Sequence, residues 1–400
     1  MKRVLFIIVT LLFTFAVSAQ EVATTPPIEA QISALDARLA KSEKRTATLE
    51  KLRQILSIKG FIQGEYDWVD SREDLNSTGS STFRIRRARL SMSGDLYKGA
   101  KGAKLDYNLY LDFARIKGSQ PSPIVEAWVR YQPFKELGVQ MGQFIPPLTF
   151  EAAQSSATYE FIDFSYVASA MARVGSEDLT GCSSSGRDTG MQLFGGFVHR
   201  NGYSIINYNV AVINGNGINV KDDNKSKDII GQLTIKPTKE LSVALYYQRG
   251  EANLSKMENY AEYGWGGNAE YVKTHRWGGG LAYYSDRAFA RGEYIGGLTG
   301  NLASEGAYIQ GGYFFHLPKN AGKIWAGGMV DYFCRNLFDY THRNTAEAKI
   351  DTRYSLCVGY KPIKYFHLQL AYSLNQRIHY TFDNNRHFGN SIKLMATAMF

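Results

Sequence analysis

Residues 104–113 read KLDYNLYLDF, an alternation of polar and apolar side chains. Successive side chains of a β-strand point to opposite faces, so this pattern predicts an extended strand with one apolar and one polar face. The apolar face would carry Leu105, Tyr107, Leu109, Leu111 and Phe113. The polar face would carry Asp106, Asn108, Tyr110 and Asp112. A run of about ten residues is long enough to cross a bilayer as a tilted strand.

The same alternation recurs to the end of the chain, from residue 57 to residue 400. Sixteen such runs are found, near 57–69, 82–95, 103–114, 123–132, 136–144, 187–198, 202–213, 227–237, 240–249, 273–285, 287–297, 304–316, 323–334, 347–361, 365–377 and 388–400. Bacterial barrels have an even number of antiparallel strands. The sequence therefore predicts an all-β fold, a transmembrane antiparallel β-barrel of about 16 strands over residues 57–400.

The connections between these runs differ in length. Residues 133–136 and 361–364 are short and turn-like, whereas 144–186 form a long connection. Outer-membrane barrels have short periplasmic turns and longer extracellular loops. The stretch 160–172 is apolar, and long ordered loops are uncommon unless they have a function. We expect the 144–186 loop to fold back into the pore as a constriction.

The first residues have the pattern of an export signal. Residues 1–19 contain Lys2 and Arg3, an apolar run over 4–17, and a small-residue site at 17–19. This predicts a signal peptide that is cleaved on export, and the apolar run is short for a membrane anchor. An exported barrel protein belongs in the bacterial outer membrane, where its partners would be lipid and lipopolysaccharide.

Between the leader and the barrel, residues 20–56 predict a periplasmic helical arm. From residue 28 the segment lacks glycine and proline. A stripe of residues recurs every three or four positions at Ile28, Ile32, Leu35, Leu39, Ser42, Thr46, Leu49, Leu52 and Leu56, apolar except at Ser42 and Thr46. A heptad-like stripe favours a coiled coil that joins subunits. A lone amphipathic helix packed on another surface is the alternative.

The C-terminus ends in an aromatic residue on an apolar stripe. Counting back by twos from Phe400 gives Ala398, Ala396, Leu394 and Ile392. This ending resembles the signal that the barrel-insertion machinery of the outer membrane recognises. We therefore expect Phe400 to contact that machinery.

Basic residues are the candidates for solute binding. Lysine and arginine total 46 against 37 acidic residues, and anion-selective pores are lined by Lys and Arg. Strand parity places Arg87 and Arg89 in the lumen and puts Arg84 and Arg86 near the outer rim, beside lipid phosphates. A bulge between Arg86 and Arg87 would reverse that assignment.

Further candidates come from the same parity and from the long loop. They are Arg130, Arg353, Arg377 and Lys393 on strands, and Arg173 in the loop. The same inner faces carry acidic residues, namely Asp106, Asp112, Glu126 and Asp351. A mixed lumen of this kind also suits a general, weakly selective diffusion porin.

Other functional classes find less support. The seven histidines form no HExxH motif, GxSxG is absent, and no CxxC pair occurs among the three cysteines. A barrel enzyme or an adhesin is thus a less favoured alternative, and no cofactor or metal is expected. Nucleic acid is not an expected partner, because the basic residues are spread around an exported barrel.

Four segments resemble a known family, the phosphate-selective porins O and P. They are FRIRRARLSMSG (83–94), EAWVRY (126–131), VQMGQFIPPL (139–148) and RDTGMQL (187–193). The resemblance implies a homotrimeric, sixteen-stranded outer-membrane porin. Its expected function is passive diffusion of small hydrophilic solutes, with a preference for anions such as phosphate.

Overall fold

The computed structural model describes residues 28–70, 79–99, 102–115, 122–174, 178–182, 186–257, 270–300, 302–335, 349–379 and 386–400. The expected signal peptide, residues 1–19, lies outside this part. The chain divides into two units, Met1–Arg53 and Gln54–Phe400. Within the described residues, no helix has both the length and the apolar character needed to cross a membrane.

Helix α2 spans Ile28–Ile55. Its ends suit the helix dipole, since Glu29 lies in the first turn and Arg53 in the last. The leucines of the heptad-like stripe are exposed, with Leu35 at 62% and Leu49 at 58%. An exposed apolar stripe of this kind gives a helix little of the packing that normally stabilises it.

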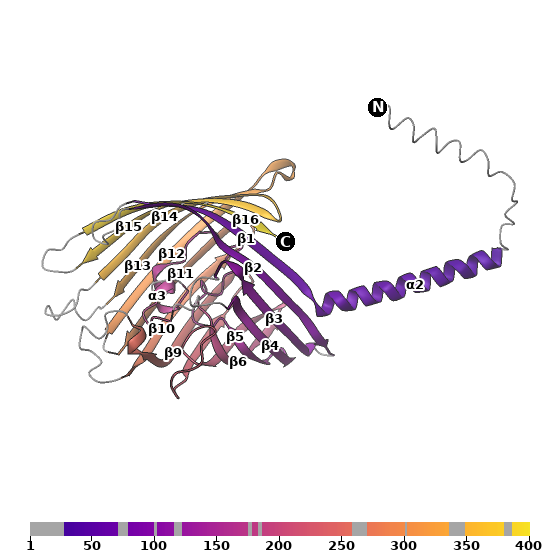
Figure 1. Cartoon of the computed structure of the whole chain (residues 1–400), viewed down its shortest axis with the longest axis horizontal. Helices are drawn as coiled ribbons and strands as arrows, with labels where there is room; N and C mark the ends of the chain where they lie inside the picture. The colour runs from indigo at the N-terminus through magenta and orange to yellow at the C-terminus, as the bar shows by residue number, and fades with distance from the viewer. Residues whose placement is uncertain are drawn as a thin grey trace, which may run out of the picture. The chain divides into compact units, whose positions relative to one another are not determined.

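Among the described residues, sixteen strands form a closed antiparallel barrel (Figure 1). The strands are β1 (Ser57–Val69), β2 (Ser80–Lys98), β3 (Lys104–Asp112), β4 (Ile124–Phe134), β5 (Leu137–Phe144), β6 (Asp188–Arg200), β7 (Tyr203–Ile213), β8 (Asp228–Ile235), β9 (Leu241–Asn253), β10 (Tyr271–Tyr284), β11 (Ala288–Thr299), β12 (Leu302–His316), β13 (Lys323–Arg335), β14 (Lys349–Ile363), β15 (Phe366–His379) and β16 (Arg386–Met399). Short helices are α3 (Tyr166–Met171), η3 (Phe113–Arg115), η4 (Leu254–Lys256) and η6 (Pro318–Asn320). The predicted fold class and strand number are confirmed.

The ring closes where the first strand pairs with the last. Phe61 lies opposite Met399 in the β1–β16 ladder. Gly60 and Phe400 exchange two backbone hydrogen bonds, each of 2.9 Å. Closure gives each of the described strands a neighbour on both sides, as a membrane requires.

Strand β14 shows why the alternating residues form this barrel. Leu356 and Val358 are 65% and 51% exposed on the outer face. Arg353 and Cys357, on the other parity, are buried inside. An apolar exterior is what lipid requires, and the polar side chains are left to the lumen.

The segment between β5 and β6 folds into the barrel. Its helix α3 lies against β11, β12 and β13, and it is drawn within the ring of strands (Figure 1). Gln63 of β1 donates to the Ser156 carbonyl at 2.8 Å, and Gln369 of β15 donates to the Tyr159 carbonyl at 3.0 Å. One segment contacts strands on several sides of the ring, so it occupies the lumen.

Candidate solute pathway

The loop divides the lumen into two walls. On the packed wall, formed by β9–β16, inward side chains are buried under the loop, including Arg276, Arg291, Glu293, Tyr308, Gln310, Asp331, Arg353, Cys357 and Gln369. On the open wall, formed by β2–β4, β6 and β7, many inward side chains are half-exposed, including Arg87, Ser91, Asn108, Glu126, Trp128, Arg130, Phe194, Asn207 and Asn209. Arg89, Asp106 and Asp112 of this wall are buried in ion pairs. Among the described residues, the half-exposed side chains of the open wall are the candidates for contact with a solute.

The arginine cluster of β2 contains a bulge. Gln63 of β1 pairs with Arg87, whereas the next residue, Gly64, pairs with Ile85, so Arg86 is the extra residue. Arg84 then donates to Glu65 at 2.6 Å, and Arg86 also bonds Glu65. Glu65 is 2% exposed and faces the lumen. The outer-rim position expected for Arg84 and Arg86 is therefore wrong, because the bulge shifts the parity.

Within this cluster Arg87 differs from its neighbours. It donates to Oε1 of Gln63 at 2.9 Å and makes no salt bridge with any described residue. Arg89, by contrast, donates to Asp112 at 2.8 Å and is 6% exposed. Within the described part of the chain, no carboxylate lies within salt-bridge distance of Arg87, which is half-exposed at the lumen surface.

Three other predicted cations face the lumen but are paired with carboxylates. Arg130 donates to Asp106 at 3.0 and 2.5 Å. Arg377 donates to Asp351 at 2.5 and 3.1 Å. Lys393 donates to Asp163 of the loop at 2.7 Å. Each pair offers a solute a dipole rather than a free charge.

Two predicted pore-lining residues are buried instead. Arg173 is 6% exposed and lies between Asp188 and Asp228, with N–O distances of 3.3 Å to each. Arg353 is 7% exposed and lies 4.6 Å from the Tyr166 ring centre. The folded loop covers both side chains, so neither faces the open wall, and we correct their assignment as solute contacts.

Carboxylates that the sequence did not single out anchor the loop. Glu293 of β11 accepts from the backbone N–H groups of Phe150 at 2.7 Å and Glu151 at 3.0 Å. It also accepts from the hydroxyls of Tyr246 and Tyr308. These partners lie far apart in sequence, and no local pattern signals them.

Glu151, in the loop itself, is a second anchor. It accepts from the Ser165 backbone N–H at 3.1 Å and from the hydroxyls of Ser165 and Tyr159. Its side chain is fully buried. Burial raises the pKa of Glu151 to about 7, although the Ser165 and Tyr159 hydrogen bonds oppose that shift.

Asp163 of the loop links two strands of the barrel. It accepts from Arg86 of β2 at 2.8 Å and from Lys393 of β16 at 2.7 Å. Burial acts to raise the pKa of Asp163, but Arg86 and Lys393 lower it well below the usual range. Asp163 therefore carries a negative charge at neutral pH and neutralises part of the basic cluster.

Solved structures with this fold are outer-membrane channels. The anion-selective porin from Comamonas acidovorans has a TM-score of 0.60 at 11% identity, covering 86% of this chain and 99% of that chain. DcaP of Acinetobacter baumannii has a TM-score of 0.58 at 13% identity, covering 86% and 97%. OmpT of Vibrio cholerae, in a trimer form, has a TM-score of 0.58 at 10% identity, and the match covers 86% of this chain and 99% of that chain.

Comparison with curated protein sequences gave no match. The sequence profile described as phosphate-selective porin O and P matches residues 57–396, which include fifteen complete strands and most of β16. The structure over the same residues is a closed barrel with a polar lumen. This chain belongs to the phosphate-selective porin O and P family of outer-membrane porins.

Proposed function

We propose that the barrel conducts small hydrophilic solutes by passive diffusion, with a modest preference for anions set mainly by Arg87. The carrying observation is that, among the described residues, Arg87 bonds only an amide oxygen, whereas its neighbour Arg89 is paired with Asp112. A fixed positive charge on the lumen wall attracts anions and repels cations. The guanidinium fork also suits phosphate, to which it can give two hydrogen bonds.

The preference is modest because other lumen cations are compensated. Arg130, Arg377 and Lys393 each have a carboxylate partner. The similar barrel from Comamonas acidovorans is an anion-selective porin, which supports the same substrate class here. The lumen contains many internal ion pairs, and Arg87 lacks a carboxylate partner among the described residues. This arrangement suits a pore that passes many small anions, including phosphate.

The test is the reversal potential of purified protein in a planar bilayer under a potassium chloride gradient. Replacing Arg87 by Gln keeps a polar side chain and removes the charge. We expect the chloride-to-potassium permeability ratio to fall about fivefold, since a unit charge acts on an ion ~4 Å away by about 1 kcal/mol in water. The matched control is Lys239→Gln, in the exposed turn before β9.

The outcomes separate the two candidate pores. A lower chloride-to-potassium permeability ratio in R87Q, with an unchanged ratio in K239Q, supports Arg87 as the residue that sets the selectivity. An unchanged ratio in R87Q excludes this residue as the selectivity element. Equal shifts in both variants would favour a general, weakly selective porin in which only overall charge matters.

We also propose that the arm holds subunits together as a coiled coil in a homotrimer. Its support is the exposed stripe that includes Leu35, Leu39 and Leu49 of α2, together with the trimer form recorded for OmpT of Vibrio cholerae. Deleting residues 28–53 is expected to leave a folded barrel that migrates as a monomer on native gels. A trimer of unchanged stability would contradict this role.

Export and insertion complete the proposal. Residues 1–19 act as a cleaved signal peptide, and Phe400 serves the barrel-insertion machinery. The apolar outer face contacts outer-membrane lipid and lipopolysaccharide. Arg84 and Arg86 bond Glu65 inside the barrel, so the lipopolysaccharide contact rests on other residues.

A further inference from the structure

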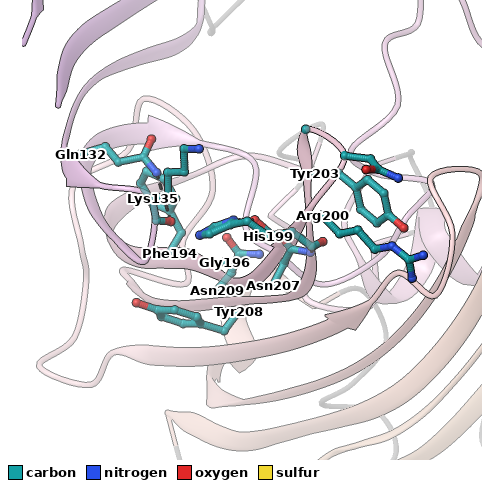
Figure 2. A pocket seen from close by; sticks show the side chains of 14 residues that line it. Gln132, Lys135, Phe194, Gly196, His199, Arg200, Tyr203, Asn207, Tyr208 and Asn209 are labelled. Carbon is teal, nitrogen blue, oxygen red and sulfur yellow. Dashed lines mark hydrogen bonds between the residues drawn. The ribbon is translucent and has the colours of Figure 1, made fainter. Parts of the chain in front are cut away.

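A cavity of about 410 Å³ lies at the short-turn end of the open wall, between the β4–β5 turn and the β6–β7 hairpin (Figure 2). Its volume falls within the ~300–1,000 Å³ typical of small-molecule sites. The lining side chains are mostly polar and include Gln132, Lys135, His199, Ser204, Asn207 and Asn209. Short turns face the periplasm in outer-membrane barrels, so this cavity lies at the periplasmic mouth of the pathway.

An aromatic and cationic stack forms one side of the cavity. Phe194 lines it, and the guanidinium of Arg130 lies 5.6 Å from the Phe194 ring centre. The same guanidinium lies 5.0 Å from the Trp128 ring. The stack is rigid, because Arg130 is also held by two hydrogen bonds to Asp106. It offers a solute an apolar ring face beside charged donors.

Two basic residues lie at the edges of the cavity. Figure 2 shows His199 between Lys135 and Arg200. Lys135 and Arg200 are exposed, and neither makes a salt bridge with a described residue. His199 is held in place by Ser204 on Nδ1 and by Glu136 on Nε2, both at 2.8 Å. The rim therefore favours a solute with negative charge.

Amide side chains supply neutral donors and acceptors. Asn207 donates to the Ser204 carbonyl at 2.9 Å, and Asn209 donates to Gln232 at 3.3 Å. Gly196 lets the Ser204 and Asn207 side chains lie directly against the strand backbone, because a Cβ there would lie 2.4 Å from Ser204 Oγ and 2.9 Å from Asn207 Oδ1. Each of these amide groups is oriented by its hydrogen bond, and its remaining donor and acceptor capacity is available to the hydroxyl groups of a solute.

We propose that this cavity binds a phosphorylated monosaccharide at the periplasmic mouth. Lys135 and Arg200 suit its phosphate, since charge-assisted hydrogen bonds to phosphate are strong. Asn207, Asn209 and Ser204 suit its hydroxyl groups, and the ring of Phe194 suits the C–H face of the sugar. This inference rests on the proposed function, because it adds a second binding position along the same open wall.

The experiment is calorimetric titration of the purified full-length protein with glucose 6-phosphate, inorganic phosphate and glucose. Glucose 6-phosphate is expected to bind about tenfold more tightly than phosphate, because the amides add hydrogen bonds. Replacing Asn207 and Asn209 by Ala is expected to remove that advantage and leave phosphate binding unchanged. Replacing Lys135 and Arg200 by Gln is expected to weaken the binding of both glucose 6-phosphate and inorganic phosphate.

The control variant is K239Q, which keeps wild-type binding if the site is local. Equal affinity for glucose 6-phosphate and phosphate in the wild type would overturn the sugar-phosphate assignment. Unchanged binding in both double variants would overturn the site. Binding is measured here without any ion current, so a failure of the R87Q selectivity test and a failure of this site are separate results.

Discussion

The two walls of the lumen follow the same alternation of inward and outward residues but differ in what covers them. On the packed wall, Asp331 is fully buried and Gln369 is 1% exposed, because the loop lies over them. On the open wall, the corresponding inward residues Asn108 and Asn209 are half-exposed. One wall acts as the core of the protein, and the other acts as the surface of a pore.

Two arginines show what this difference means for charge. Arg353 of the packed wall bonds Asp331 at 2.7 Å and the Phe164 carbonyl at 2.5 Å. Arg87 of the open wall bonds, among the described residues, only Gln63. A buried charge is tolerated when it is paired and hydrogen-bonded, whereas a solvated charge needs no partner. Residues of the same type therefore hold the loop on one wall and attract solutes on the other.

The largest expected effect comes from breaking the buried pair. Arg353→Gln leaves Asp331 charged and buried without its partner, and losses of about 3–5 kcal/mol are typical of such a change. Arg87→Gln is expected to alter the free energy of unfolding by no more than about 0.5 kcal/mol. Urea unfolding of both variants in the same lipid or detergent measures the contrast.

A second substitution makes the comparison stricter. Adding Asp331→Asn to Arg353→Gln removes the orphaned charge, so part of the lost stability is expected to return. No recovery in the double variant would mean that Arg353 acts through its contact with the Phe164 carbonyl or the Tyr166 ring. Similar losses in the free energy of unfolding for R87Q and R353Q would contradict the distinction between the two walls.

The strands were predictable because lipid and lumen impose a period of two on every one of them. Parity also predicted which face Arg353 and Asp351 share. Parity did not predict which charged residues pair across neighbouring strands, since that depends on the strand register. Asp331 lies directly opposite Arg353, and Asp351 lies directly opposite Arg377. Opposite charges at facing positions stabilise a sheet, but the register is known only when the turns are placed.

The sequence left the bulge as an open alternative and did not indicate the loop anchors, for a different reason. Two adjacent arginines, Arg86 and Arg87, interrupt the alternation, so the sequence allowed a bulge there, but it did not decide between a bulge and a regular strand opposite Gln63 and Gly64. The hydrogen bond from Glu151 to Glu293 joins residues 142 positions apart. Contacts of this kind arise from closing the ring and filling it, which no local pattern records.

The smaller effect concerns the packed wall alone and appears as a pH dependence. Glu151 of the loop is buried, and burial raises its pKa to about 7 from 4.5. An acid whose pKa is raised by folding is protonated more readily in the folded state, so its ionisation disfavours folding. The contribution of Glu151 to stability is expected to be greatest below pH ~4.5 and to be lost as the pH rises through about 7, by on the order of 3 kcal/mol. Unfolding curves at pH 5 and pH 8 measure this change.

The variant Glu151→Gln is expected to reduce the difference in stability between the two pH values, because the amide carries no charge at either pH. The matched variant Glu240→Gln, in an exposed turn, keeps the wild-type pH dependence. An undiminished pH dependence in E151Q would place the titrating group elsewhere on the packed wall.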